Sequence, residues 1–115
     1  HGISVEGFPN LFLMLGPNPA TGHTSTLLYI EPEVHHAIAC MQRVRREGKR
    51  WIEVRSEVMT EYNRSLQQRL GGSVWAQCRS WYRMDGGKIV AIFPGFTAEY
   101  VKAVQRTDVQ AYQLG

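Results

Sequence analysis

The sequence has few cysteines and no long hydrophobic run. Its two cysteines, Cys40 and Cys78, lie far apart in a chain of 115 residues. Small secreted domains usually carry more, so we expect reduced thiols and a cytoplasmic protein. The apolar run Leu11–Leu15 is far shorter than the roughly 20 residues of a membrane-spanning helix. No charged segment precedes the run and no small-residue cleavage site follows it, so the sequence predicts neither a secretory signal nor a membrane partner.

Several patterns typical of catalysis and ligand binding are also missing. No G-x-G-x-x-G occurs, so the chain lacks a complete dinucleotide fingerprint of its own. A phosphate-binding loop needs four residues between its glycines and then a lysine. Here five residues separate Gly16 from Gly22, and His23 takes the place of the lysine. His36 and Cys40 could share a helix face, but a metal site needs three or four ligands. We therefore predict no catalytic residues and no metal site in this chain.

The composition is that of a packed domain with a local excess of positive charge. Hydrophobic residues make up 43% and charged residues 20%, and the net charge is +3. The excess comes from a basic cluster, which two glutamates oppose. The cluster consists of Arg43, Arg45, Arg46, Lys49, Arg50 and Arg55. Such a cluster can bind phosphates, but cations are also favoured at a helix C-terminus, and we favour that reading.

The order of elements predicts a mixed α+β piece without internal repeats. Leu11–Leu15 is continuously apolar, as in a strand that is covered on both faces. A helix over Thr24–Arg46 follows, with Pro32 expected to kink or restart it. Its apolar stripe between Leu27 and Val44 is expected to lie in the core. The remaining predictions are a helix over Trp51–Leu70, a β-hairpin from Val74–Tyr82 and Lys88–Phe93, a short helix over Ala98–Arg106 capped by Thr97, and a loose tail over 107–115.

The turn between the first strand and the first helix is the most informative segment. It brings free backbone N–H groups to the positive end of a helix dipole, which suits an anion or an electron-rich ring edge. Thr24 and Ser25 can cap that helix or donate to a ligand. An ordinary strand-to-helix connection remains the alternative on physical grounds alone.

A second candidate surface is the aromatic hairpin, which carries Trp75, Trp81, Tyr82 and Phe93 beside basic side chains. Aromatic and basic residues together can bind single-stranded nucleic acid. The alternative function is therefore a free-standing binding module, for example for RNA. We favour packing of these rings against the helices, so nucleic acid is not the expected partner.

Ordered motifs along the chain resemble one enzyme family. They are Gly2-Ile3, Gly7-Phe8-Pro9-Asn10, Leu15-Gly16-Pro17-Asn18, Gly22-His23-x-Ser25, Ile30-Glu31, Trp75-x-x-Cys78-x-Ser80-Trp81-Tyr82, Gly87-Lys88 and Phe93-Pro94-Gly95. In this order they resemble the C-terminal third of flavin-dependent monooxygenases, of the Baeyer–Villiger and flavin-containing group. Pro32 and Glu33 depart from the family sequence, which more often has a small residue and Gln at these positions.

The resemblance implies a C-terminal fragment of an α/β flavoprotein with two dinucleotide-binding domains. Residues 1–50 would return to the FAD domain, and 51–115 would add a helix and the hairpin. The whole enzyme would use FAD and NADPH, and a peroxyflavin would oxygenate a ketone or a soft heteroatom of a small-molecule substrate. The fragment alone would be inactive, would bind no cofactor, and would associate with the remainder of the flavoenzyme or with itself.

The resemblance also implies which residues lie near the cofactors. Those expected near the flavin ring are Gly16, Pro17, Asn18, Gly22, His23, Thr24 and Ser25. Trp81 matches a family tryptophan near the nicotinamide cofactor and the substrate.

Overall fold

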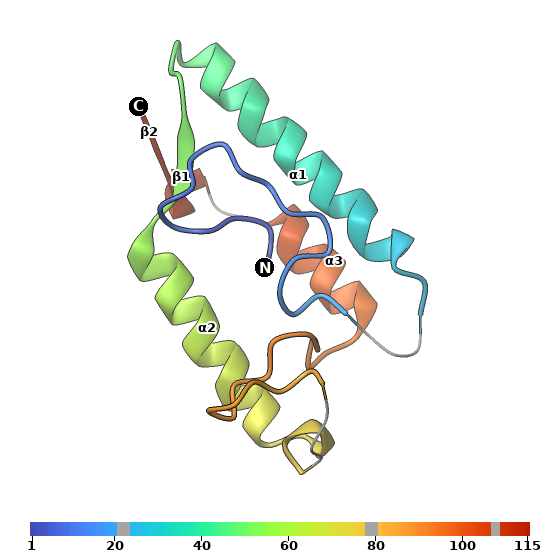
Figure 1. The fold of residues 1–115 in the computed structure, drawn as a ribbon. Coiled ribbons are helices and arrows are strands. Elements are labelled where there is room, and N and C mark those ends of the chain that lie inside the picture. Colours follow the sequence, from blue (N-terminus) through green and yellow to red (C-terminus); the bar gives the residue numbers. More distant parts are fainter. Residues whose placement is uncertain (21–23, 78–80, 107–108) are drawn as a thin grey trace.

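Three α-helices and a two-stranded sheet make up the regular structure. The computed structural model describes residues 1–20, 24–77, 81–106 and 109–115. In chain order the elements are α1 (Leu27–Arg46), β1 (Ile52–Val54), α2 (Ser56–Gly71), the 3-10 turn η1 (Val74–Ala76), α3 (Thr97–Gln105), the 3-10 turn η2 (Val109–Ala111) and β2 (Tyr112–Leu114). Figure 1 shows the N-terminal segment running between α1 and α2. The predicted mixed α and β class is confirmed.

The long first helix is present, and it does not restart at Pro32. α1 runs from Leu27 to Arg46 through this proline. Proline costs no hydrogen bond in the first turn of a helix, where the N–H groups have no helical carbonyl to bond. Pro32 lies in the second turn, so α1 continues through it at the cost of the one bond that an N–H at this position would donate to the carbonyl of Leu28.

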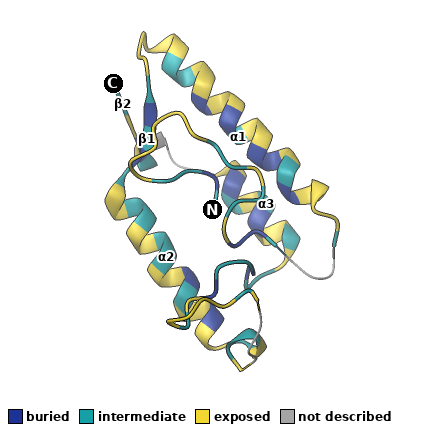
Figure 2. Ribbon diagram, in the orientation of Figure 1, coloured by how far each residue is buried: buried dark blue, intermediate teal, exposed yellow. Residues whose placement is uncertain are grey.

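The face that α1 buries differs from the predicted one. Its buried residues are Tyr29, Pro32, Glu33, Ala37 and Cys40. Most of the expected core stripe is instead exposed, with Leu27 69%, Ile38 41% and Met41 54% exposed, whereas its members Ile30 and Val44 are half-buried. Figure 2 shows this exposed outer face along the whole helix. The prediction was wrong because the buried face contains a proline, a carboxylate and small residues, which apolar periodicity does not detect.

Leu11–Leu15 does not form the predicted strand. The run has no strand assignment, and Leu11 and Met14 are 41% and 37% exposed. Asn10 and Leu15 at its two ends both adopt left-handed backbone conformations, with φ of 62° and 53°. A strand also needs neighbours, but here Leu11 N–H bonds the nearby carbonyl of Phe8 at 3.3 Å, and Leu13 N–H bonds the carbonyl of Ile3 at 2.7 Å.

The two strands form where a helix and a loose tail were expected. Ile52–Val54 pairs antiparallel with Tyr112–Leu114. The second helix therefore begins at Ser56 instead of Trp51, although it ends at Gly71 as the Gly-Gly signal predicts. The prediction of a loose tail was wrong for residues 112–114, because pairing with β1 and burial of Tyr112 hold them in place.

The predicted hairpin is reduced to a tight turn. Residues 74–76 form η1 instead of strand, and among the described residues of this segment the pairing is a single antiparallel bridge between Arg83 and Ile89. α2 takes over the role of a neighbouring strand: the amide of Gln67 bonds both the N–H and the carbonyl of Ile89, at 3.0 and 2.7 Å. Thr97 begins α3 but does not cap it, since its hydroxyl lies 3.0 Å from that of Tyr29.

Two apolar clusters make up the core. The larger joins α1, α2, α3 and the segment around Phe93, where Tyr100 packs against the rings of Tyr29 and Phe93. The smaller surrounds the sheet, and Phe12 packs against both clusters. None of the described helices is both long enough and apolar enough to cross a membrane.

Candidate functional site

The loop at Gly16–Asn18 is packed tightly against the N-terminal residues. A Cβ atom on Gly16 would collide with the carbonyl oxygen of Gly2, and one on Gly2 would collide with the carbonyl oxygen of Pro17. Glycine is therefore required at both positions of this backbone crossing. The close approach fixes the path of the chain immediately before α1.

Asn18 holds the loop to the segment that precedes α3. It is 3% exposed and left-handed, with φ of 70°. Its side-chain amide donates to the carbonyls of Ile89 and Ile92, at 2.8 and 3.1 Å, and its N–H donates to Val90. Both amide hydrogens are thus occupied within the protein. Asn18 supports the predicted site instead of offering these donors to a ligand.

The start of α1 is open to solvent. Ser25, Thr26, Leu27 and Leu28 are all exposed, and Thr24 is half-buried. The Ser25 hydroxyl accepts from Leu27 N–H at 3.3 Å, so this serine supports the first turn, as predicted from its residue type. Gly22 and His23 lie outside the described residues. An exposed helix start of this kind attracts anions and electron-rich ring edges.

Trp81 is the most exposed of the aromatic residues in the hairpin region, at 82%. Its ring lies 5.9 Å from that of Tyr82, which in turn packs edge-on against Trp75 at 5.6 Å. Phe93 is buried in the core. The aromatic residues therefore pack mainly on one another and on the helices, as favoured, and leave Trp81 free for a contact outside this segment.

The basic cluster is partly engaged in local contacts. Arg43 pairs with Glu47 at 2.8 Å, one helical turn away, and Arg55 donates to the carbonyl of Gln110 at 3.0 Å. Arg43, Arg45 and Arg46 form the last turn of α1, where the helix dipole favours cations. This agrees with the structural reading of the cluster.

A buried carboxylate lies directly behind the loop. Glu33 on α1 is 0% exposed. Its Oε2 accepts from Leu15 N–H at 2.8 Å, and its Oε1 accepts from the Tyr100 hydroxyl at 2.7 Å. Burial, followed by the bond to Glu33, raises the pKa of Tyr100, so this phenol stays protonated and can donate. Sequence reasoning missed this function of Glu33.

A second polar group joins α1 to the sheet. The Tyr112 hydroxyl lies 2.8 Å from His36 Nε2 and 3.1 Å from the Ser4 hydroxyl, and Cys40 Sγ lies 3.5 Å from the same imidazole nitrogen. Burial lowers the pKa of His36 and raises that of Tyr112 to about 12. Among the described residues, no group of three or more His, Cys, Asp or Glu side chains is arranged to hold a metal.

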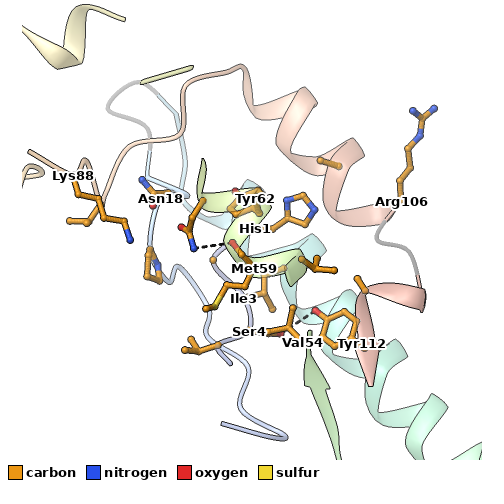
Figure 3. A pocket seen from close by; sticks show the side chains of 18 of the residues that line it. His1, Ile3, Ser4, Asn18, Val54, Met59, Tyr62, Lys88, Arg106 and Tyr112 are labelled. Atoms are coloured by element: carbon orange, nitrogen blue, oxygen red, sulfur yellow. Dashed lines mark hydrogen bonds between the residues drawn. The ribbon is translucent and has the colours of Figure 1, made fainter. Parts of the chain in front are cut away.

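A cavity of about 770 Å³ lies between the N-terminal segment, α2 and the sheet. Figure 3 shows its mainly apolar wall, with Ile3, Val54 and Met59, and Arg106 pointing away from it. The hydroxyl of Tyr62 is buried at this wall with no hydrogen-bond partner among the described residues, and burial raises its pKa to about 12. A partial signal for this wall was visible in the sequence, since Val54, Val58 and Tyr62 repeat every four residues.

Comparison with known proteins connects this geometry to an enzyme family. No protein-family model matches the chain. A Baeyer–Villiger monooxygenase of Pseudomonas aeruginosa is 34% identical, over 98% of this chain and 22% of the relative. An FAD-binding monooxygenase of Aspergillus niger is 32% identical, over 92% of this chain and 18% of the relative.

A solved structure has the same fold. An oxidized steroid monooxygenase bound to NADP superposes with a TM-score of 0.81 at 20% identity, covering 98% of this chain and 22% of its own. The chain is homologous to a segment of flavin-dependent Baeyer–Villiger monooxygenases. It spans only about a fifth of the length of the curated relatives it matches.

The start of α1 fits a flavin ring, whereas the side chain of Asn18 does not fit as a donor to one. The open start of α1, flanked by exposed Leu27 and Leu28, can receive a flat ring with an electron-rich edge. Asn18 does not fit as a side-chain donor, because its amide hydrogens are already bonded.

Proposed function

We propose that the full protein containing this chain is an FAD- and NADPH-dependent monooxygenase that oxygenates a ketone or a soft heteroatom of a small molecule. The observation that carries the proposal is 34% identity to a Baeyer–Villiger monooxygenase over nearly the whole chain. The same fold in a steroid monooxygenase that binds NADP supports it. The bound flavin would supply the activation of oxygen, by the route that the family resemblance implies.

Within that enzyme, this chain would form the C-terminal part and would shape one side of the flavin site. Gly16, Pro17 and Asn18 would set the path of the backbone, and Thr24, Ser25 and the start of α1 would face the ring edge. Gly22 and His23 belong to the same proposed contact by their place in the sequence. Trp81, highly exposed, would meet the nicotinamide cofactor or the substrate.

The remainder of the flavoenzyme is the proposed partner of the outer face of α1. Four apolar side chains on this face are exposed: Leu27, Val34, Ile38 and Met41. An uncovered apolar stripe on a helix is typical of an interface. Because the relatives are about five times longer than this chain, the missing domains are its natural cover. The isolated chain is expected to bind no flavin and to be inactive, since it lacks a dinucleotide fingerprint.

The deciding experiment uses the protein encoded by the complete reading frame around this segment. A yellow protein with a flavin spectrum should consume NADPH and oxygen, and the rate should rise when a cyclic ketone or a thioether is added. A colourless full-length protein that neither takes up FAD nor oxidises NADPH would exclude the proposed function.

A further inference from the structure

Glu33 joins three segments that are distant in sequence. It belongs to α1, and its two carboxylate oxygens bond Leu15, before the loop, and Tyr100, on α3. The Tyr100 hydroxyl also lies 2.7 Å from the carbonyl oxygen of His1. Burying a carboxylate costs free energy unless its oxygens are hydrogen-bonded. Glu33 is 0% exposed, so its carboxylate needs these contacts.

The bond to Leu15 stabilises an unfavourable backbone conformation. Leu15 is left-handed, with φ of 53°, which is uncommon for a residue other than glycine, asparagine or aspartate. Its N–H points to Glu33 instead of to a neighbouring strand. Gly16, Pro17 and Asn18 follow directly, so the conformation of Leu15 determines where the loop begins.

The bond to Tyr100 anchors the carboxylate from the other side. Tyr100 is 0% exposed, and its ring packs against Tyr29 and Phe93 at 4.9 and 5.2 Å. The phenol is therefore fixed by packing and directs its hydroxyl at Glu33. The carboxylate has little freedom to leave Leu15, and the loop is held at a constant position relative to α1.

We propose that Glu33 is a positioning residue of the flavin site: through Leu15 it holds the Gly16–Asn18 loop in register with the start of α1, so that both can meet the flavin ring together. The proposal rests on the proposed function, because it gives this network a task in cofactor binding. Glu33 itself would not touch the flavin, since it lies behind the loop and is closed off from solvent.

The test compares four variants of the full-length flavoprotein. In Glu33→Gln, the amide oxygen can accept from Leu15 N–H while the amide nitrogen donates to the Tyr100 hydroxyl, whose proton then goes to His1. This variant should keep the wild-type flavin affinity and visible spectrum. Glu33→Ala should weaken FAD binding about tenfold, as expected for the loss of one well-formed hydrogen-bonded contact, and should shift the flavin absorption bands. His35→Ala, at an exposed position of the same helix, should change neither.

Glu33→Asp keeps the charge but withdraws the carboxylate by one methylene. It serves as the second test variant if Glu33→Ala does not fold. It should fold with a normal circular dichroism spectrum and bind FAD several-fold more weakly. Unchanged FAD affinity and unchanged bands in a folded Glu33→Asp or Glu33→Ala protein would overturn the proposal. A wild-type protein that takes up no flavin would instead refute the proposed function, so the two failures are distinguishable.

Discussion

Asn18 illustrates how a residue in a recognisable motif can serve the fold. Its place in Gly16-Pro17-Asn18 suggested a cofactor contact, but its amide bonds the carbonyls of Ile89 and Ile92 in a buried position. No sequence pattern announces these partners, which lie more than seventy residues away. The type of the residue was informative, since asparagine tolerates the left-handed conformation observed here.

Replacing Asn18 should therefore destabilise the protein before it affects any chemistry. Asn18→Gly keeps the left-handed backbone accessible but removes the side-chain donor to the Ile92 carbonyl and leaves Gln67 as the remaining donor to the Ile89 carbonyl, which should lower the free energy of unfolding by about 1–3 kcal/mol. Asn18→Ala should cost roughly 1 kcal/mol more, because alanine disfavours positive φ. Urea denaturation measures both.

Asn63→Ala is the matched control for these substitutions. Asn63 bonds the carbonyl of Met59 within α2, and alanine is the better helix former, so the free energy of unfolding should change little. Equal destabilisation by Asn18→Gly and Asn63→Ala would contradict the structural role of Asn18.

Cys40 is expected to make stability depend on pH in the alkaline range. Burial raises the pKa of its thiol from 9.0 to about 11. Below about pH 9 the thiol is protonated in both states, so it contributes no pH dependence. Between about pH 9 and 11 the unfolded chain loses this proton first, and stability falls by at most roughly 3 kcal/mol.

Urea midpoints of the wild type and of Cys40→Ala, compared at pH 8 and pH 10.5, measure this effect. The variant is expected to be less stable at both values because of lost packing, but to lose less stability on going from pH 8 to 10.5. Parallel pH profiles of the two proteins would show that the buried thiol is not the source.

Among the elements, apolar periodicity predicted where helices occur better than it predicted which of their faces are buried. The three helices appear close to their predicted ranges because proline, glycine and periodic apolar residues report local propensity. The buried face of α1 was mispredicted, since Glu33 is buried through partners on other segments. The strands at Ile52–Val54 and Tyr112–Leu114 were missed because each has only three residues and depends on a partner far along the chain.

Gln67 adds hydrogen bonds to the apolar packing between α2 and the Ile89 segment, where Leu66 and Leu70 share a core cluster with Ile89. The Gln67 amide makes two hydrogen bonds to the backbone of Ile89 and so replaces a missing strand. Gln67→Ala should lower the free energy of unfolding by about 1–3 kcal/mol, because the Ile89 N–H loses its partner, while the Ile89 carbonyl keeps the bond from Asn18.

Gln68→Ala is the neighbouring control, since Gln68 is exposed, and it should be nearly neutral. Hydrogen exchange of the Ile89 amide adds a local readout and should accelerate only in Gln67→Ala. An Ile89 amide that remains protected in that variant would show that other contacts hold the segment.

At the scale of the molecule, the chain is elongated, with extents of 48 × 28 × 19 Å. Two separate apolar clusters share its interior, and the apolar outer face of α1 is uncovered. Length and composition predicted a packed domain but could not reveal this shape, which follows from how the segments dock. An elongated shape with an uncovered apolar face agrees with a segment that packs against further protein.

The uncovered face of α1 should make the isolated 115-residue chain self-associate, which is also the association with itself that the family resemblance implied. Val34 and Ile38 lie one helical turn apart on this face and are 38% and 41% exposed. Two copies of the isolated chain can cover the stripe for each other. Changing both residues to lysine should shift the isolated chain towards monomer in sedimentation velocity, without loss of helical circular dichroism.

The control for this experiment is a lysine pair at exposed positions beside the stripe, His35→Lys with Ala39→Lys, which adds the same side chains without removing apolar surface. This pair should leave self-association close to the wild-type level. In the full-length protein the Val34 and Ile38 substitutions should instead lower stability, because they would place two charges in the interface between this segment and the cofactor domains. A wild-type chain that is monomeric at high concentration, together with a full-length double variant of normal stability, would show that the outer face of α1 is an ordinary solvent-exposed surface.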